Sequence, residues 1–365
     1  MSNELNQGRR RILATSLMMI PAAGALLTNS ACGQDGDLSP ILRLPFRGTM
    51  PSLDGATGWL NSPPLTAVSL LGKVVLVQFW TYSCINWLRT LPYVRAWAEK
   101  YKDQGLIVIG VHTPEFEFEK NVDNIRRAVN GMLIGYPTAI DSGSAVWRAF
   151  RNNSWPAYYF IDAQGKIRHQ HNGEGEYERS ERTIQKLLSE AGVGGVSREL
   201  VSVEGRGVEA AADWGNLRTP ETYVGYERTQ GFSSPGRGVQ DSRRTYTAPA
   251  RLDLNHWALA GDWTIGKQAA TLNKANGRIA YRFHARDLHL VMGPVSPGTS
   301  VQFRVFIDGQ APRAAHGVDV DEQGSGVVVE QRLYQLIRQS MPIAARQFEI
   351  EFLGSGVETY SFTFG

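Results

Sequence analysis

The sequence predicts two folded domains, an α/β domain followed by an all-β sandwich. In the first half, short apolar runs such as 74–79 and 105–111 are separated by stretches with helical spacing. This alternation is typical of a central sheet with helices on both faces. In the second half, apolar and polar residues alternate over segments such as 301–307 and 348–352, which is the period of half-buried strands. A chain of 365 residues is long enough for two such cores.

Residues 1–32 are interpreted as an export signal. Three arginines at 9–11 precede an apolar stretch at 12–27 that proline and glycine interrupt. Such a stretch is too short for a membrane span and is normal for a signal peptide. The arginines fit a twin-arginine signal. Residues 29–32 are similar to a lipoprotein cleavage box, so Cys32 is a candidate for lipidation, while ordinary cleavage or a retained anchor stay open.

Each alternative places the working domains outside the cytoplasm, in the periplasm or on the outer face of the cell envelope. Membrane contact is then expected only through a lipid or signal anchor. The composition argues against a nucleic-acid partner, because the formal net charge is only +3 and the charged residues are scattered. The chain has only two cysteines, Cys32 and Cys84, so no internal disulfide framework is expected. No cofactor or phosphate-binding motif is present.

The segment 73–92 carries the candidate chemistry. An apolar run at 74–79 predicts a buried strand, and apolar residues three or four apart from Leu88 onward predict a helix. Cys84 lies between the predicted strand and the predicted helix, at the expected start of the helix. Because a helix N-terminus has unpaired N–H groups and a positive dipole end, we expect the Cys84 thiolate to be favoured. Pro92 is expected to kink the helix.

The remaining elements of the first domain are predicted in order. Strands are expected at 105–111, 136–140, 158–162 and 166–171, and helices at 116–129, 145–150 and 180–192, the last with Ser180 as N-cap. Glycine and small residues then replace periodicity, which indicates a linker. Asp-Gly at 308–309 and Pro-Gly at 297–298 are predicted turns between the later strands. The predicted boundaries are 33–195 for the first domain, 196–215 for the linker and 216–365 for the second domain.

The strings FWTYSCINW at 79–87 and WPAYYFID at 155–162 resemble the thioredoxin superfamily, and within it the exported TlpA/DipZ-type thiol–disulfide oxidoreductases of the redoxin family. This resemblance implies a thioredoxin-like first domain, with residues 59–65 as the hairpin before its first core strand. The strings RFHARDLHL at 282–290 and RLYQLIRQ at 332–339 extend the resemblance to the DipZ-type C-terminal domain. That domain looks like a carbohydrate-binding module, which implies a jelly-roll-like sandwich with a glycan partner.

The resemblance also identifies two changed positions. The family motif looks like DFWTYSCINC, whereas this chain has QFWTYSCINW. Trp87 stands where the family has its second, resolving cysteine, and Gln78 stands where it has an acid that helps move that thiol's proton. The two changes are mutually consistent, because the acid has no proton to accept when the second thiol is missing. We also expect Trp87, within a turn of Cys84, to shield the thiol.

Cys84 is therefore the candidate lone nucleophile, acting in thiol–disulfide exchange on exported protein thiols or disulfides, with a membrane redox donor as a further partner. A single thiol can be resolved by a small thiol, form lasting mixed disulfides, or cycle through sulfenic acid. The resemblance implies a cis Trp155-Pro156 bond packed against the cysteine, which leaves the backbone free to dock an extended substrate.

Three further side chains, Trp80, Tyr82 and His112, are expected near the active site. A role for His112 in lowering the pKa of Cys84 and a plain loop role both stay open.

A second hypothesis is a redox-silent scaffold whose β-domain binds a glycan or a protein partner. Trp87 and Gln78 favour it, since each replaces a group that dithiol chemistry uses. Four aromatic side chains are candidates either for a sugar platform or for core packing: Tyr223, Tyr226, Trp257 and Trp263. The pair of histidines at 169 and 171 offers a third hypothesis, a metallochaperone, but solvated edge residues are the preferred interpretation, and no metal site is predicted.

Overall fold

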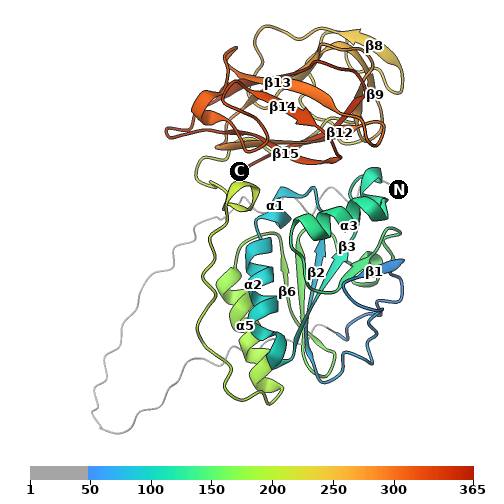
Figure 1. Cartoon of the computed structure of the whole chain (residues 1–365), viewed down its shortest axis with the longest axis vertical. Helices are drawn as coiled ribbons and strands as arrows, with labels where there is room; N and C mark the ends of the chain where they lie inside the picture. Colours follow the sequence, from blue (N-terminus) through green and yellow to red (C-terminus); the bar gives the residue numbers. More distant parts are fainter. Residues whose placement is uncertain (1–47) are drawn as a thin grey trace, which may run out of the picture. The chain divides into compact units, whose positions relative to one another are not determined.

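The computed structural model describes residues 48–365 (Figure 1). The predicted export signal and Cys32 lie outside the described residues. Among residues 48–365, no helix is both long and apolar enough to cross a membrane. The described chain forms an α/β part and an all-β part.

The α/β part is built on a mixed six-stranded sheet with the order β1-β4-β3-β2-β5-β6. Three neighbouring strands are parallel: β2 (Val74–Trp80), β3 (Leu106–His112) and β4 (Thr138–Ile140). The other three pair in antiparallel fashion: β1 (Gly58–Leu60), β5 (Ala157–Ile161) and β6 (Ile167–Asn172). Every residue of β2 is buried, as expected for a central strand that is covered on both faces.

Helices and short 3-10 turns connect these strands. In chain order they are α1 (Ile85–Leu88), α2 (Leu91–Tyr101), η2 (Lys102–Gln104), η3 (Glu117–Lys120), α3 (Val122–Gly131), α4 (Ala145–Ala149) and α5 (Tyr177–Glu190).

The helix predicted after Cys84 is two helices rather than one kinked helix. Helix α1 ends at Leu88 and α2 begins at Leu91, with Pro92 in its first turn. Proline is accommodated there because the first amides of a helix have no intrahelical acceptor. The single helix predicted at 116–129 is likewise divided into η3 and α3, because the Asn121 side chain accepts hydrogen bonds from the amides of residues 123 and 124 and starts a new helix.

Two other local predictions were wrong. Residues 59–65 do not form a hairpin of their own, since β1 pairs with β4, which is far along the chain. Helix α5 begins at Tyr177 with Glu176 in the capping position, so Ser180 is a buried residue inside the helix instead of its N-cap.

The second part contains two antiparallel sheets that share strand β9 (Trp257–Ile265). The first half of β9 pairs with β11, and its second half pairs with β8 and β10. Gly261 lies at the change of partner with φ +99°, and a Cβ there would lie 2.9 Å from the Cα of Gly277. Glycine is therefore required where the strand passes from one sheet to the other.

The remaining elements of this part are η4 (Gly207–Glu209), β7 (Thr222–Tyr223), β8 (Arg243–Tyr246), β10 (Ala270–Leu272), β11 (Gly277–Phe283), β12 (Asp287–Pro294), β13 (Val301–Ile307), η5 (Arg313–Ala315), β14 (Ser325–Val328), β15 (Arg332–Arg338), β16 (Arg346–Phe352) and β17 (Val357–Phe364).

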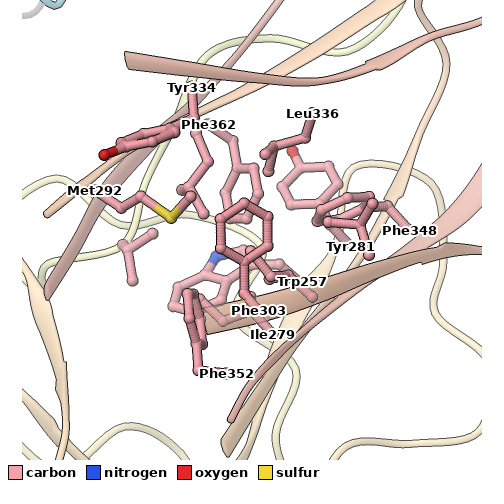
Figure 2. Close-up of a cluster of buried hydrophobic side chains, with 14 of the residues drawn as sticks. Trp257, Ile279, Tyr281, Met292, Phe303, Tyr334, Leu336, Phe348, Phe352 and Phe362 are labelled. Atoms are coloured by element: carbon pink, nitrogen blue, oxygen red, sulfur yellow. The ribbon is translucent and has the colours of Figure 1, made fainter. Parts of the chain in front are cut away.

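Large apolar side chains from both sheets form the core of the all-β part (Figure 2). Tyr281, Phe348 and Phe362 are fully buried there. Inward-facing residues alternate along the strands, as the sequence period predicts for a sandwich. The predicted order of an α/β domain followed by an all-β sandwich is confirmed.

The segment predicted as a linker is anchored to the α/β part. The buried carboxylate of Glu181 accepts hydrogen bonds from Trp97, Tyr101 and the backbone amide of Val201, and pairs with Lys100 at 2.9 Å. A buried carboxylate is stable only with several such donors. The segment therefore follows a defined path between the two parts.

Candidate functional site

The candidate site is centred on Cys84, at the N-cap of α1 directly after strand β2. Its Sγ lies 3.8 Å from the carbonyl oxygen of Trp155, and the residue stays partly exposed. The Trp155-Pro156 peptide bond is cis, as the resemblance implied. The Trp155 indole donates a hydrogen bond to the carbonyl of Thr113 at 3.0 Å, which ties this loop to the end of β3. The structure thus brings the predicted nucleophile and the predicted docking loop together.

The expectation that the Cys84 thiolate is favoured was wrong. Burial raises the pKa of the Cys84 thiol above its ordinary value, and the negative charge of Glu115 raises it further. Hydrogen bonds from the amides of Asn86 and Trp87 lower the pKa, but they do not reverse the shift. Helix α1 has only four residues, so its dipole is short. Desolvation and a nearby carboxylate outweigh it.

The Trp87 side chain, which was expected to shield the thiol, is itself fully buried. Its indole stacks on that of Trp80 with ring centroids 4.4 Å apart and an interplanar angle of 24°. A large aromatic core residue therefore occupies the position where the family resemblance implies a second cysteine.

His112 ends strand β3 and is fully buried among aromatic rings. It contacts the Trp80 ring edge-on at 4.7 Å and stacks on the Tyr82 ring at 5.5 Å. Burial lowers the pKa of His112 to about 3, so the imidazole is neutral at physiological pH. These ring contacts favour a structural role for His112, packed at the end of β3, over a role in activating Cys84.

Gln78 lies at the centre of a buried network of neutral hydrogen bonds. Its amide nitrogen donates to Thr90 Oγ1 at 3.1 Å and to the Tyr158 hydroxyl at 3.3 Å. The Tyr136 hydroxyl donates to Gln78 Oε1 at 3.4 Å. An amide suits this position because it is both donor and acceptor, and no charge has to be buried.

A buried carboxylate that sequence reasoning missed holds the active-site turn. Glu119 Oε1 accepts from the Ser83 hydroxyl at 2.6 Å, and Oε2 accepts from the amides of Glu115 and Phe116 at 2.6 and 2.9 Å. Burial raises the pKa of Glu119, although its hydrogen bonds act in the opposite direction. The Glu119 carboxylate thus holds Ser83, which directly precedes Cys84, and Glu115, whose negative charge raises the pKa of Cys84. The sequence did contain a signal for this contact. Acidic residues follow directly after β3, at the same edge of the parallel strands as Cys84.

Residues of the all-β part contact the same segment. Glu115 Oε1 lies 2.8 Å from the Arg228 guanidinium and accepts a hydrogen bond from the Tyr223 hydroxyl, also at 2.8 Å. The Arg228 guanidinium lies 3.5 Å from the centroid of the Tyr223 ring. The Tyr360 ring packs on Phe118 at 4.6 Å. Two chain segments more than one hundred residues apart therefore meet beside the thiol site.

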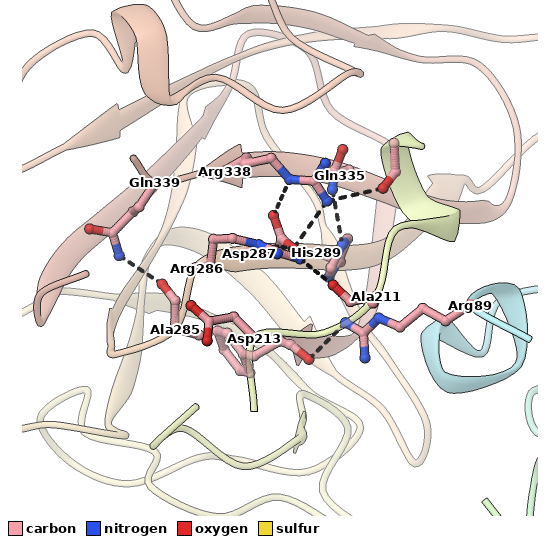
Figure 3. Close-up of polar contacts among 12 residues, drawn as sticks. Arg89, Ala211, Asp213, Ala285, Arg286, Asp287, His289, Gln335, Arg338 and Gln339 are labelled. Carbon is pink, nitrogen blue, oxygen red and sulfur yellow. Dashed lines mark hydrogen bonds and ion pairs between the residues drawn. The ribbon is translucent and has the colours of Figure 1, made fainter. Parts of the chain in front are cut away.

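A second polar contact between the parts involves Arg89, between α1 and α2 (Figure 3). Its guanidinium pairs with Glu174 at 3.0 Å and donates to the carbonyl of Phe364 at 3.2 Å. In the all-β part, Arg286 and Arg338 converge on the buried carboxylate of Asp287. Burial would raise the pKa of Asp287, but these two arginines hold it below its ordinary value.

Two of the four candidate platform residues belong to the core of the sandwich. Trp257 and Trp263 are fully buried in the sandwich core, so they do not form a sugar platform. Tyr226 donates to Asp241. His169 packs against Phe160, and the described residues contain no group of three or more ligands that could hold a metal ion.

Comparisons with known proteins assign the chain to a family. Residues 54–170 match the AhpC/TSA family, and residues 219–365 match the thioredoxin-like C-terminal domain family. The thiol-disulfide oxidoreductase YkuV of Bacillus subtilis is 34% identical over 146 residues, which are 40% of this chain and 97% of YkuV. The chain belongs to the thioredoxin-like family.

Both parts of the chain have a relative within this family. Protein DipZ of Mycobacterium bovis is 38% identical over 287 residues, which cover 78% of this chain. The chain spans only 40% of the length of DipZ. A solved thioredoxin-like protein in its oxidised form is 34% identical and covers 40% of this chain and 97% of its own, with a TM-score of 0.37. The predicted kinship with TlpA/DipZ-type thioredoxin-like proteins is confirmed.

Proposed function

We propose that this protein takes part in thiol–disulfide exchange through Cys84 alone, on protein thiols or disulfides outside the cytoplasm. The observation that carries the proposal is the position of Cys84, a partly exposed residue whose Sγ lies 3.8 Å from the carbonyl oxygen of Trp155. An extended substrate on that backbone would present its sulfur to the thiol. The similarity to YkuV, a thiol-disulfide oxidoreductase, supports the same chemistry.

The exchange step balances without a second protein thiol. The Cys84 thiol loses its proton to solvent, and the thiolate attacks one sulfur of a substrate disulfide. A bond forms between Cys84 and that sulfur, the substrate S–S bond breaks, and the departing thiolate takes up a proton. A small external thiolate then attacks the substrate's sulfur in the mixed disulfide. A disulfide forms between the external thiol and the substrate, the bond to Cys84 breaks, and the Cys84 thiolate takes up a proton. Trp87 offers no sulfur for this second step, so the external thiol is required.

The raised pKa of Cys84 shapes this chemistry. A smaller fraction is thiolate at neutral pH, which slows the first attack, but a thiol of high pKa is also a poor leaving group. Attack of an external thiol at the partner's sulfur must expel the Cys84 thiolate, which is the poorer leaving group. This attack is therefore preferred only when the partner's sulfur is more accessible than the Cys84 sulfur. Slow capture with slow release is the expected behaviour, which favours lasting mixed disulfides over rapid turnover.

The redox-silent scaffold remains the second candidate function. The raised pKa of Cys84 and the buried, stacked indole of Trp87 favour it. The glycan-binding version loses support, because two of the four proposed platform residues, Trp257 and Trp263, lie in the core. Under this hypothesis a protein partner of the all-β part is the simpler alternative.

The deciding experiment uses the C32S variant, in which Cys84 is the only thiol. The variant is incubated with oxidised glutathione at pH 8, and the mixed disulfide is measured by intact mass, with C32S/C84S as the control. Formation of one adduct in the folded protein, and its release by reduced thiol, is the expected result. An adduct that forms only after unfolding would reject thiol exchange and leave the redox-silent scaffold.

Export and lipidation are proposed on sequence grounds alone. The three arginines at 9–11 and the sequence at 29–32 motivate the proposal that the mature protein works in the cell envelope. The test is fractionation of cells that express either the full chain or its R9K/R10K variant. Retention of the unsubstituted protein in the cytoplasm would refute it.

A further inference from the structure

We propose that Arg228 and Tyr223 of the all-β part are positioning residues of the thiol site, which act on Cys84 through the carboxylate of Glu115. This inference deepens the proposed function, since it names residues outside the α/β part that tune the same thiol. It rests on a continuous series of contacts from the all-β part to Cys84.

The first contact is between the two parts. Glu115 Oε1 is shared by the Arg228 guanidinium and the Tyr223 hydroxyl, each at 2.8 Å. The guanidinium also lies over the Tyr223 ring at 3.5 Å, so Arg228 is held by an ion pair and a cation–π contact together. Only about 7% of the Glu115 side chain is exposed, which limits screening of its charge by water.

The second contact carries the position of Glu115 to the thiol. The Glu119 carboxylate accepts from the Glu115 amide through Oε2 and from the Ser83 hydroxyl through Oε1. Ser83 directly precedes Cys84. A displacement of Glu115 therefore moves the group that holds the active-site turn, as well as moving a negative charge near the sulfur.

The charges around the site define the expected direction. Glu115 and Glu221 both raise the pKa of Cys84, and Arg228 compensates part of the Glu115 charge. Loss of Arg228 should leave Glu115 uncompensated and raise the thiol pKa further. Loss of the Glu115 charge should lower the thiol pKa and remove the influence of Arg228. The buried carboxylate of Glu119 also contacts this segment, through the amide of Phe116, and the Tyr360 ring packs on Phe116 and Phe118.

The test is a double-substitution cycle in the C32S background with E115Q, R228Q and E115Q/R228Q. Thiolate absorbance in the far ultraviolet is measured against pH, with the matching C84S variant as blank, and unfolding curves confirm that each variant is folded. R278Q is the matched control. Arg278 also pairs with a carboxylate, that of Glu351 at 3.2 Å, but this partner lies on the sandwich and is not a residue of the thiol site.

We expect E115Q to increase the thiolate fraction at a fixed alkaline pH, about tenfold for each unit by which the pKa falls. R228Q should decrease the fraction when Glu115 is present and change it little in E115Q. R278Q should change nothing. Y223F keeps the ring under Arg228 and removes one donor to Glu115, so it should act in the same direction as R228Q, with a smaller effect.

An equal effect of R228Q with and without Glu115, or no effect in either background, would overturn the inference. A shift by R278Q as large as that by R228Q would also overturn it. The thiolate signal needs no disulfide partner. A failure of this inference is therefore distinguishable from a failure of Cys84 to form the mixed disulfide with glutathione.

Discussion

Replacement of Trp87 by cysteine tests whether the active-site turn still supports dithiol chemistry. The substitution W87C restores a Cys-x-x-Cys spacing with Cys84. It also removes a fully buried indole that stacks on Trp80 at a centroid distance of 4.4 Å. Two opposing effects on stability are therefore expected, a loss of packing and a gain from a new disulfide.

The packing loss is the larger effect. Truncation of a buried tryptophan costs about 3–5 kcal/mol in free energy of unfolding, which corresponds to a fall of roughly 6–20 °C in Tm for a cooperative unit of 150–250 residues. A disulfide that closes a loop of four residues returns about 2 kcal/mol. Reduced W87C should therefore be the least stable form, and oxidised W87C should lie between it and the wild type.

The assay compares thermal unfolding of wild type, W87A, and W87C in its oxidised and reduced forms. W87A carries the same loss of packing without a thiol at position 87, so it isolates the disulfide contribution. Reduced W87C should also reduce insulin disulfides, whereas W87A should not. Destabilisation of W87A by less than about 1 kcal/mol would refute the description of Trp87 as a packed core residue. Failure of W87C to form the intramolecular disulfide would refute the geometry of the turn.

Three further predictions address buried groups of the fold. Q78E places an acid in a neutral network in which the Thr90 hydroxyl already donates to the Trp87 carbonyl. Its folded pKa should rise above the ordinary value, so chemical denaturation should show destabilisation that increases by about 1.4 kcal/mol per pH unit as the pH rises above about 4.3. A pH-independent cost would contradict this. H112F removes an imidazole with a pKa of about 3. The wild type should lose stability as the pH falls from about 6.5 towards that value, and H112F should lose about 1.4 kcal/mol less per pH unit over this window. Parallel stability–pH curves for the two proteins would show that His112 does not titrate as described. G261A should cost at least about 1–3 kcal/mol by thermal or chemical unfolding, because its Cβ meets the backbone of the neighbouring strand, whereas G298A, at φ +80° with no atom within 4 Å of the added Cβ, should cost less.

The sequence predicted well whatever depends on neighbours along the chain. The buried run of β2 and the spacing after Cys84 located the strand, the turn and the start of the helix. It predicted less well where distant segments compete. Residues 59–65 pair with β4 instead of forming a hairpin, since the hydrogen-bonding edge of β4 is brought alongside by the fold. The start of α5 also differed, since several residues near 177–180 are acceptable helix starts on local grounds.

The site shows the same division. Cys84 at the strand-to-helix turn and the cis Trp155-Pro156 bond beside it were recognisable from the sequence. Neither the contacts of Glu119 nor the contact of Glu115 with Arg228 was predicted, because each joins segments that meet only in the folded protein. The expected direction of the Cys84 pKa shift was wrong for the same reason. A helix N-terminus is a local property, whereas burial and the charge of Glu115 are not.

The family, the order of the two folds and the cysteine at a strand-to-helix turn could be recognised from the sequence, because hydrophobic period and local motifs encode these features directly. The folded protein was needed to see that burial of the thiol opposes its ionisation. The tertiary structure also decided that Trp87 packs inward on Trp80, and that Arg228 from the all-β part reaches the carboxylate beside Cys84. These features depend on desolvation and charge proximity, which arise when segments distant along the chain are packed together.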